Sequence, residues 1–370
     1  MNSERDQSDS LFSSENSLVL RGLAILAIMY HNLLHTKFFG FSVENEMSFS
    51  YDKVDAFMYA MSTCRNWGAD IVSFLGWLGV PVFVFLSGYG LSKKYLFRQS
   101  IQKQEYISNS TLVLNGKKYI RHSYLKLFLL MLPAVLFFMI IDIAVHDYSG
   151  AAKKLFSLTL FSNFDYPLLH YSPGVYWYFS LTFQYYVLFY LFHNRFKGFW
   201  LFLWSVLSLI VLAFLSANNS SWLLSVYRHC FTGWFPLFAL GIWLGRHSHA
   251  SFLEASWLKS FFLVVCSFLL ILVMSLNLLT WTIVPIVALV FFMALSNLVL
   301  KIDWIRNPLK WVGQYSAFIF VCHPIARIVA NRLCGAVPLW GILVVYFLLT
   351  MLLAIIYGKL YKRLIVLFKV

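Results

Sequence analysis

The sequence predicts an all-α fold, a polytopic integral membrane bundle of about ten transmembrane helices. Hydrophobic residues make up 60% of the 370 residues and charged residues only 12%, whereas soluble globular domains contain about 45–50% and about 25%, respectively. A water-soluble fold would have to expose much of this apolar surface, and a bilayer is the solvent that accepts it. Aromatic residues (19%) suit the same environment because they settle at membrane interfaces.

Ten apolar runs approach the length of about 20 residues that a spanning helix needs. They lie near residues 18–36, 70–92, 122–145, 173–192, 199–216, 229–245, 259–276, 280–300, 313–332 and 338–360. We expect one transmembrane domain, residues 17–362, between an N-terminal tail (1–16) and a C-terminal tail (363–370). The N-terminal tail lacks the basic start of a cleavable signal peptide, so the first run is expected to stay in the mature protein.

Lysine and arginine residues set the predicted orientation. If the N-terminus is cytoplasmic, 21 of the 29 Lys and Arg residues fall in inner segments and 8 in outer ones, as the positive-inside rule requires. We therefore expect both termini in the cytoplasm and an even number of spans. The net charge of +14 is explained by topology and by contact with anionic membrane lipids. It also suits an acidic soluble ligand, whereas no nucleic acid is expected.

The connections between the runs differ in character. Two long outer loops, near 37–69 and 146–172, are rich in polar and aromatic residues, and the stretch 52–66 could form a helix on the membrane surface. The main inner loop, 93–121, carries the densest basic cluster. The cluster ends with Lys117, Lys118 and Arg121. Positive-inside topology alone explains such a cluster, and a phosphate-binding rim is the functional alternative.

The first run contains two residues that are expensive in hydrocarbon, Arg21 and His31. Ten residues of helix separate them by about 15 Å, which would place Arg21 near the cytoplasmic face and His31 about half a bilayer deeper. Arginine suits phosphate, and a neutral imidazole suits proton transfer near pH 7. The alternatives are an interfacial anchor for Arg21 and an interhelical hydrogen bond for His31. His35, one turn further on, is either an interfacial residue or a neighbour of His31.

Two further residues could support a site. Ser87, in the second run, resembles a nucleophile, but no G-x-S-x-G elbow surrounds it. His323 precedes Pro324, which disturbs a helix and leaves polar groups for the imidazole to contact, and a structural role is the alternative to a supporting role in the site. The five cysteines form no C-x-x-C pair, and no His/Cys cluster has the spacing of a metal site, so no metal is expected.

Five motifs, in order along the chain, resemble the acyltransferase-3 family of bacterial transmembrane acyltransferases. They run through nearly the whole chain, from about residue 17 to 360, and comprise Arg21-Gly22-Leu23-Ala24 with His31, the Phe-rich run Pro81–Tyr89, Trp177–Ser180 with Gln184–Tyr186, Phe235–Gly241, and Gly313–Ser316 with His323. The resemblance implies Arg21 and His31 as the donor-site and catalytic pair and Arg121 as a further donor-site residue. One departure is Thr182, at a place where the family often carries Glu.

The resemblance also implies a reaction: transfer of an acyl group, most often acetyl, from cytoplasmic acyl-CoA to a hydroxyl of a glycan or lipid-linked saccharide in the bacterial inner membrane. We expect Arg21, Lys117, Lys118 and Arg121 to bind the CoA phosphates and His31 to act as base or to hold the acyl group. No tightly bound cofactor is expected. A transporter or flippase of lipid-linked saccharides is the alternative. The sequence fixes neither the acyl group, the acceptor nor the oligomeric state.

Overall fold

The computed structural model of the chain is built from helices. It describes residues 14–36, 38–63, 66–105, 116–165, 167–168, 174–193, 195–218, 221–247 and 256–370. Within these ranges there is no β-strand, and one isolated bridge joins Cys334 and Val337. The predicted all-α fold is therefore confirmed. Residues 1–13 of the predicted N-terminal tail lie outside the described ranges.

Each of the ten predicted runs contains a helix. The helices that carry the runs are α2 (Ser14–Leu34), α4 (Trp67–Leu75) continuing through a 3-10 turn (Gly76–Gly79) into α5 (Val80–Glu105), α6 (Gly116–Ala144), α9 (Trp177–Phe192), α10 (Gly198–Ala217), α12 (Phe231–His247), α13 (Trp257–Met274), α15 (Val284–Val299), α17 (Ser316–Arg332) and α18 (Leu339–Leu367). The connecting helices are α3 (Tyr51–Thr63), α7 (Tyr148–Leu155), α11 (Ser221–His229), α14 (Leu278–Trp281) and α16 (Asp303–Gln314). The helix expected at 52–66 is α3.

Six helices among the described residues are long and apolar enough to cross a membrane: α2, Trp67–Tyr95, Lys117–Ala144, α10, α13 and α18. The pair α16 and α17, bent by 79° at its break, makes a seventh if it counts as one span. The helices α9, α12 and α15 contain only 16, 17 and 16 residues. The structure therefore supports six or seven spans by length and composition. The number ten and the orientation of the termini stay predictions.

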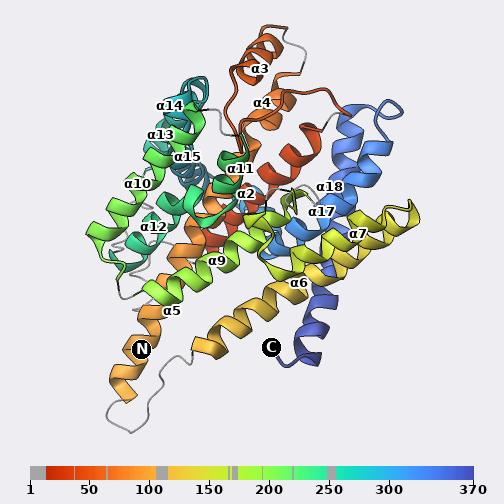
Figure 1. The fold of residues 1–370 in the computed structure, drawn as a ribbon. Coiled ribbons are helices and arrows are strands. Elements are labelled where there is room, and N and C mark those ends of the chain that lie inside the picture. The colour runs from red at the N-terminus through yellow and green to blue at the C-terminus, as the bar shows by residue number, and fades with distance from the viewer. Residues whose placement is uncertain are drawn as a thin grey trace.

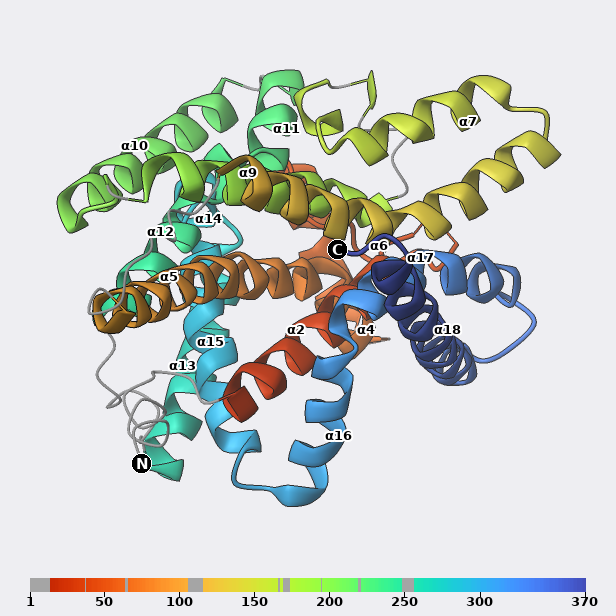
Figure 2. The same cartoon turned by 90° about the horizontal axis from the view of Figure 1, so that it is seen from below.

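The spanning helices divide into central and peripheral ones. In the most apolar stretch of Trp67–Tyr95, 72% of the residues are buried, and in that of α2 61% are buried, against 17% for α13 and 22% for α10. Seen from below, α2 and the first turns of α5 lie inside the bundle and α10, α13 and α18 toward its outside (Figure 2). Most exposed side chains of the peripheral helices are apolar, as contact with lipid requires, and the exposed charges of α13 and α18 lie near helix ends.

Glycine contacts bring the central helices together. A Cβ on Gly22 of α2 would overlap the backbone of Leu309 in α16, and a Cβ on Gly88 of α5 would overlap the backbone of Phe238 in α12. In membranes, small residues let helix backbones approach closely, because packing rather than the hydrophobic effect drives association. These contacts fix α2 and α5, the two helices that carry most of the sequence-predicted site.

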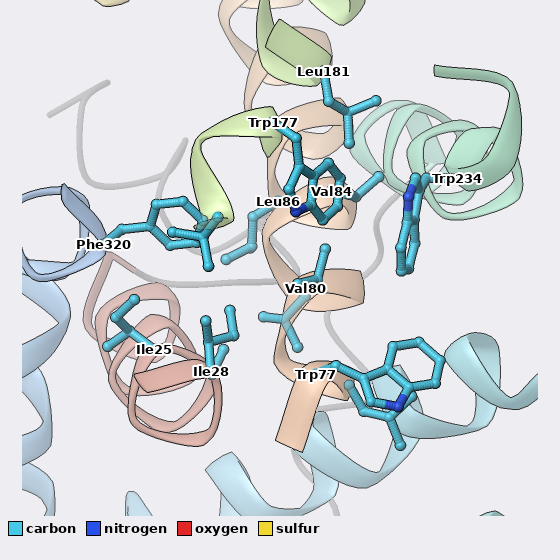
Figure 3. Close-up of a cluster of buried hydrophobic side chains, with 14 of the residues drawn as sticks. Ile25, Ile28, Trp77, Val80, Val84, Leu86, Trp177, Leu181, Trp234 and Phe320 are labelled. Carbon is cyan, nitrogen blue, oxygen red and sulfur yellow. The ribbon is translucent and has the colours of Figure 1, made fainter. Parts of the chain in front are cut away.

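The two ends of the bundle carry different elements. Figure 1 shows α3 and α4 at one end, and the last turns of α5, the first turn of α6 and the end of α18 at the opposite end. Between them, an apolar core separates the ends. Figure 3 shows Ile25 and Ile28 of α2 on one side of α5 and Trp234 of α12 on its other side, with Val80 of α5 between them.

Candidate active site

His31 is buried near the C-terminal end of α2, where only 2% of the residue is exposed. Its Nδ1 lies 2.8 Å from the backbone carbonyl oxygen of Ser73. A carbonyl oxygen only accepts hydrogen bonds, so Nδ1 carries the proton and Nε2 carries the lone pair. Nε2 is buried and has no hydrogen-bond partner in the described part of the chain. The imidazole is thus held in one tautomer with its basic nitrogen unoccupied, as a general base needs.

Close packing against the turn before α5 sets the position of His31. A Cβ placed on Gly76 would lie 2.6 Å from the Cβ of His31, so a larger residue at position 76 would displace His31 or the turn. On the other side, Arg327 of α17 donates to the carbonyl oxygen of Asn32 over 2.9 Å. The helix end that carries His31 is therefore held from two directions.

His35 lies one turn beyond His31 and stacks on it. The ring centroids are 4.6 Å apart and the ring planes meet at 26°. His35 Nδ1 lies 2.7 Å from the carbonyl oxygen of His31, so its proton, too, lies on Nδ1. The sequence left open whether His35 is only an interfacial residue, and the structure places its ring against the candidate base.

Arg21 lies toward the other end of α2. Ten residues of helix separate it from His31 by about 15 Å along the axis, so the two side chains do not meet. The Arg21 side chain is exposed, and its charge acts on the phenols of Tyr178 and Tyr186 in α9. A guanidinium with an accessible, planar set of donors is suited to a phosphate.

Ser87 belongs to the surroundings of Arg21 rather than those of His31. Its hydroxyl donates to the carbonyl oxygen of Phe83 over 2.8 Å, and it shares a hydrogen bond with the hydroxyl of Tyr178. Neither partner is a base that would activate a serine nucleophile. Ser87 instead orients Tyr178 beside Arg21.

A basic pocket opens between the start of α6 and the end of α9. It has a volume of about 470 Å³ and is lined by Lys117, Ile120, Arg121, Tyr124, Phe183 and Tyr190. Lys117 and Arg121 are four residues apart and so share one face of α6, whereas Lys118, the next residue, is turned from that face and does not line the pocket. The structure therefore gathers two of the three predicted phosphate-binding residues of the basic cluster and leaves out Lys118.

His323 is fully buried in α17. Its Nδ1 lies 3.1 Å from the carbonyl oxygen of Ile319, four residues earlier, and its Nε2 has no partner among the described residues. The charge of Arg327 acts on both His323 and His31. His323 therefore lies at the His31 end of the site, one turn before Arg327 on the same helix.

The sequence reasoning missed the residues that link these groups. Arg327 lies inside an apolar run, four residues after His323. A charge within the membrane is costly, and this cost alone marks Arg327 as a candidate functional residue. Tyr178, Tyr186 and Tyr190 recur at multiples of four residues and so line one face of α9. That face also carries Thr182, whose hydroxyl donates to the carbonyl oxygen of Tyr178 over 2.8 Å.

The candidate site thus has two parts, which contain residues at different ends of α2. Arg21, the tyrosine face of α9 and the basic pocket form a cationic part, and His31, His35 and His323 form an imidazole part about 15 Å away along the helix axis. A cationic region binds anions, and an imidazole with an unoccupied lone pair takes protons. The arrangement suits a long, anionic substrate whose reactive end reaches inward.

The profile of the acyltransferase domain family (Acyl_transf_3) matches residues 18–359, nearly the whole chain. The chain belongs to the acyltransferase-3 family. It is therefore a membrane acyltransferase, and its six or seven candidate spans make it a multi-pass membrane protein. No curated protein and no solved structure matches the chain.

Proposed function

We propose that this acyltransferase moves an acetyl group from cytoplasmic acetyl-CoA to a hydroxyl of a cell-envelope or exported glycan, or of its lipid-linked precursor. The observation that carries the proposal is the state of His31, whose Nδ1 is fixed by Ser73 and whose Nε2 is buried and unoccupied. Such an imidazole is ready to take the proton of a hydroxyl as that hydroxyl attacks a thioester. The proposed location is the bacterial inner membrane, with both termini cytoplasmic.

The cationic part of the site would bind the donor. CoA carries several phosphates, and Lys117, Arg121 and Arg21 supply cationic donors for them. Tyr186 faces Arg21 and precedes the pocket residue Tyr190 by one helical turn. The pantetheine arm would follow this row of phenols from the pocket past Arg21 and then extend to His31. The donor would not be tightly held between turnovers, and no further cofactor is needed.

The transfer step balances without any other reactant. The acceptor oxygen attacks the thioester carbonyl, a C–O bond forms and the C–S bond breaks. His31 Nε2 takes the hydroxyl proton and returns it to the departing thiolate, so the products are an ester and free CoA. A second route uses Nε2 as the nucleophile and forms a transient acyl-imidazole. Parallel double-reciprocal plots would support the acyl-imidazole route, and intersecting plots would support direct transfer.

The proposal is tested in membranes from a host that expresses the wild type or one variant. Base-labile acetyl groups on cell-surface glycans are measured, and protein amounts are compared by blot. We expect His31→Ala and Arg21→Ala to lose acetylation at normal protein amounts, and His247→Ala, which alters an exposed histidine at the end of α12, to retain it. If acetylation survives in both site variants, the pair is structural and the transporter interpretation takes precedence.

A further inference from the structure

A loop residue joins the histidines at the outer end of α2. A ring nitrogen of His31, a ring nitrogen of His35 and a carboxylate oxygen of Glu44 all lie within 4.8 Å of one another. Glu44 Oε2, like His31 Nε2, is buried without a hydrogen-bond partner in the described ranges. Both imidazoles carry their protons on Nδ1, so the other ring nitrogen of each, Nε2, is a hydrogen-bond acceptor, like the Glu44 carboxylate.

Three consecutive backbone carbonyls hold this loop in place. Lys53 Nζ donates to the carbonyl oxygen of Glu44 over 2.8 Å, and Trp281 Nε1 donates to that of Asn45 over 2.8 Å. Arg228 donates to the carbonyl oxygen of Glu46 through Nε (2.9 Å) and a terminal nitrogen (2.6 Å). All three donors are side chains, so the backbone beside Glu44 is fixed independently of its own carboxylate.

The support behind the loop is itself rigid. Arg228 is 1% exposed, and its guanidinium lies 4.2 Å from the ring centroid of Trp234, 5.0 Å from that of Trp281 and 5.6 Å from that of Trp77. A buried arginine stacked among three indoles and bonded to a carbonyl has little freedom. The loop therefore holds Glu44 beside His31 on a rigid support, as a substrate-binding residue requires.

Buried hydrogen-bond acceptors that lack donors are costly, so the site beside Glu44 and His31 favours a ligand that supplies hydrogen-bond donors. We propose that Glu44 binds the acceptor substrate, and that this substrate presents two neighbouring hydroxyls, one to His31 Nε2 and the other to the Glu44 carboxylate. The proposal rests on the acyl transfer proposed above and names the acceptor as a vicinal diol. The hydroxyl at His31 loses its proton and becomes the ester oxygen, and the hydroxyl at Glu44 keeps its proton.

A metal cation is the other ligand that His31, His35 and Glu44 could bind, and the geometry of the two rings disfavours it. Zinc needs imidazole lone pairs that converge on a point about 2.0–2.1 Å from each nitrogen. Lone pairs lie in the ring planes, and the stacked rings of His31 and His35 are inclined by only 26°, so the two lone pairs lie in nearly parallel planes and meet poorly at one point. A pair of hydroxyls can satisfy such separate acceptors without moving the rings.

The test uses the purified full chain with labelled acetyl-CoA and two probe acceptors, cis-cyclohexane-1,2-diol and cyclohexanol, which differ by the second hydroxyl. Hydrolysis of acetyl-CoA without acceptor is measured in parallel, because it requires the donor site and His31 but no second hydroxyl. We expect Glu44→Ala to lower kcat/KM for the diol about 10- to 100-fold, the range for one charge-assisted hydrogen bond. We expect it to change kcat/KM for cyclohexanol and the rate of hydrolysis less than threefold, with Glu44→Gln in between and exposed Asp55→Ala unchanged.

Four results would overturn the proposal. One is an equal loss on both acceptors, and a second is no preference of the wild type for the diol. Another is one bound metal ion per wild-type chain that is absent from Glu44→Ala, because the site would then be a metal centre. The last is a wild type that neither hydrolyses acetyl-CoA nor transfers its acetyl group, which overturns the proposed function as well. Intact hydrolysis without diol preference overturns the role of Glu44 alone.

Discussion

Removal of either pocket cation is expected to weaken donor binding. Lys117 and Arg121 line the pocket at the start of α6, and each would make a charge-assisted hydrogen bond to a CoA phosphate. Such bonds contribute about 1.5–3 kcal/mol when buried and about 0.2–1 kcal/mol when exposed. Both side chains are accessible, so we take about 1 kcal/mol for each, which is about a fivefold rise in Kd for acetyl-CoA. The double alanine variant should bind about 25-fold more weakly if the effects add.

The assay is isothermal titration of the purified protein with acetyl-CoA at two ionic strengths. Lys118→Ala is the matched control, because it removes the same charge from the same helical turn but outside the pocket lining. Its Kd should stay within about twofold of the wild type, because an exposed charge outside the pocket is screened by salt. Equal losses for Lys117→Ala and Lys118→Ala would refute the reasoning, since binding would then depend on diffuse surface charge rather than on this pocket.

Further outcomes follow from packing and from the loop that carries Glu44 and Glu46. Gly76→Ala should displace His31 and so lower kcat, while the Kd for the donor stays as in the wild type. Gly68→Ala is the control, because its added Cβ meets nothing within 4 Å, and it should change neither kcat nor Kd. Equal kcat values for the two variants would contradict the role of Gly76. Burial, with the charge of Glu44, raises the pKa of Glu46 from 4.5 to about 8. The folded state then holds a proton that the unfolded state releases, so the free energy of unfolding should fall by about 1 kcal/mol per pH unit between about pH 4.5 and 8. Glu46→Gln should flatten this profile in thermal unfolding, and parallel profiles would argue against it. Arg228→Lys removes the contact of two arginine nitrogens with the carbonyl oxygen of Glu46 and should lower the free energy of unfolding by about 2 kcal/mol. An unchanged melting temperature would show that this contact does not stabilise the fold.

The apolar runs predicted the helices better than the spans. The run 229–245 looks continuous, but α11 ends at His229 and α12 begins at Phe231. Pro285, in the first turn of α15, fixes the start of that helix and divides the run 280–300 into α14 and α15. Such breaks depend on local backbone geometry, which a hydropathy window averages away.

The candidate site was predictable where its residues share one helix. The spacing of Arg21 and His31 predicted two separate parts, because ten residues of helix have a fixed length. Glu44 could not be predicted, because its place depends on hydrogen bonds from Trp281 and Arg228, far along the chain, to the carbonyls of the two residues that follow it. The choice of Lys117 over Lys118 depends on how α6 faces α9, which neighbouring positions in a sequence do not reveal.

The central claim is that the Arg21 end of α2 belongs to the donor-binding part of the site and the His31 end to the catalytic part. It is tested most directly by measuring, for one set of purified variants, both the Kd for acetyl-CoA and the rate of acetyl transfer. The account predicts that His31→Ala keeps the wild-type Kd while transfer falls at least about 100-fold, the usual range for loss of a general base. It predicts that Lys117→Ala combined with Arg121→Ala raises Kd but retains transfer at saturating donor. Transfer by His31→Ala at the wild-type rate would contradict the account.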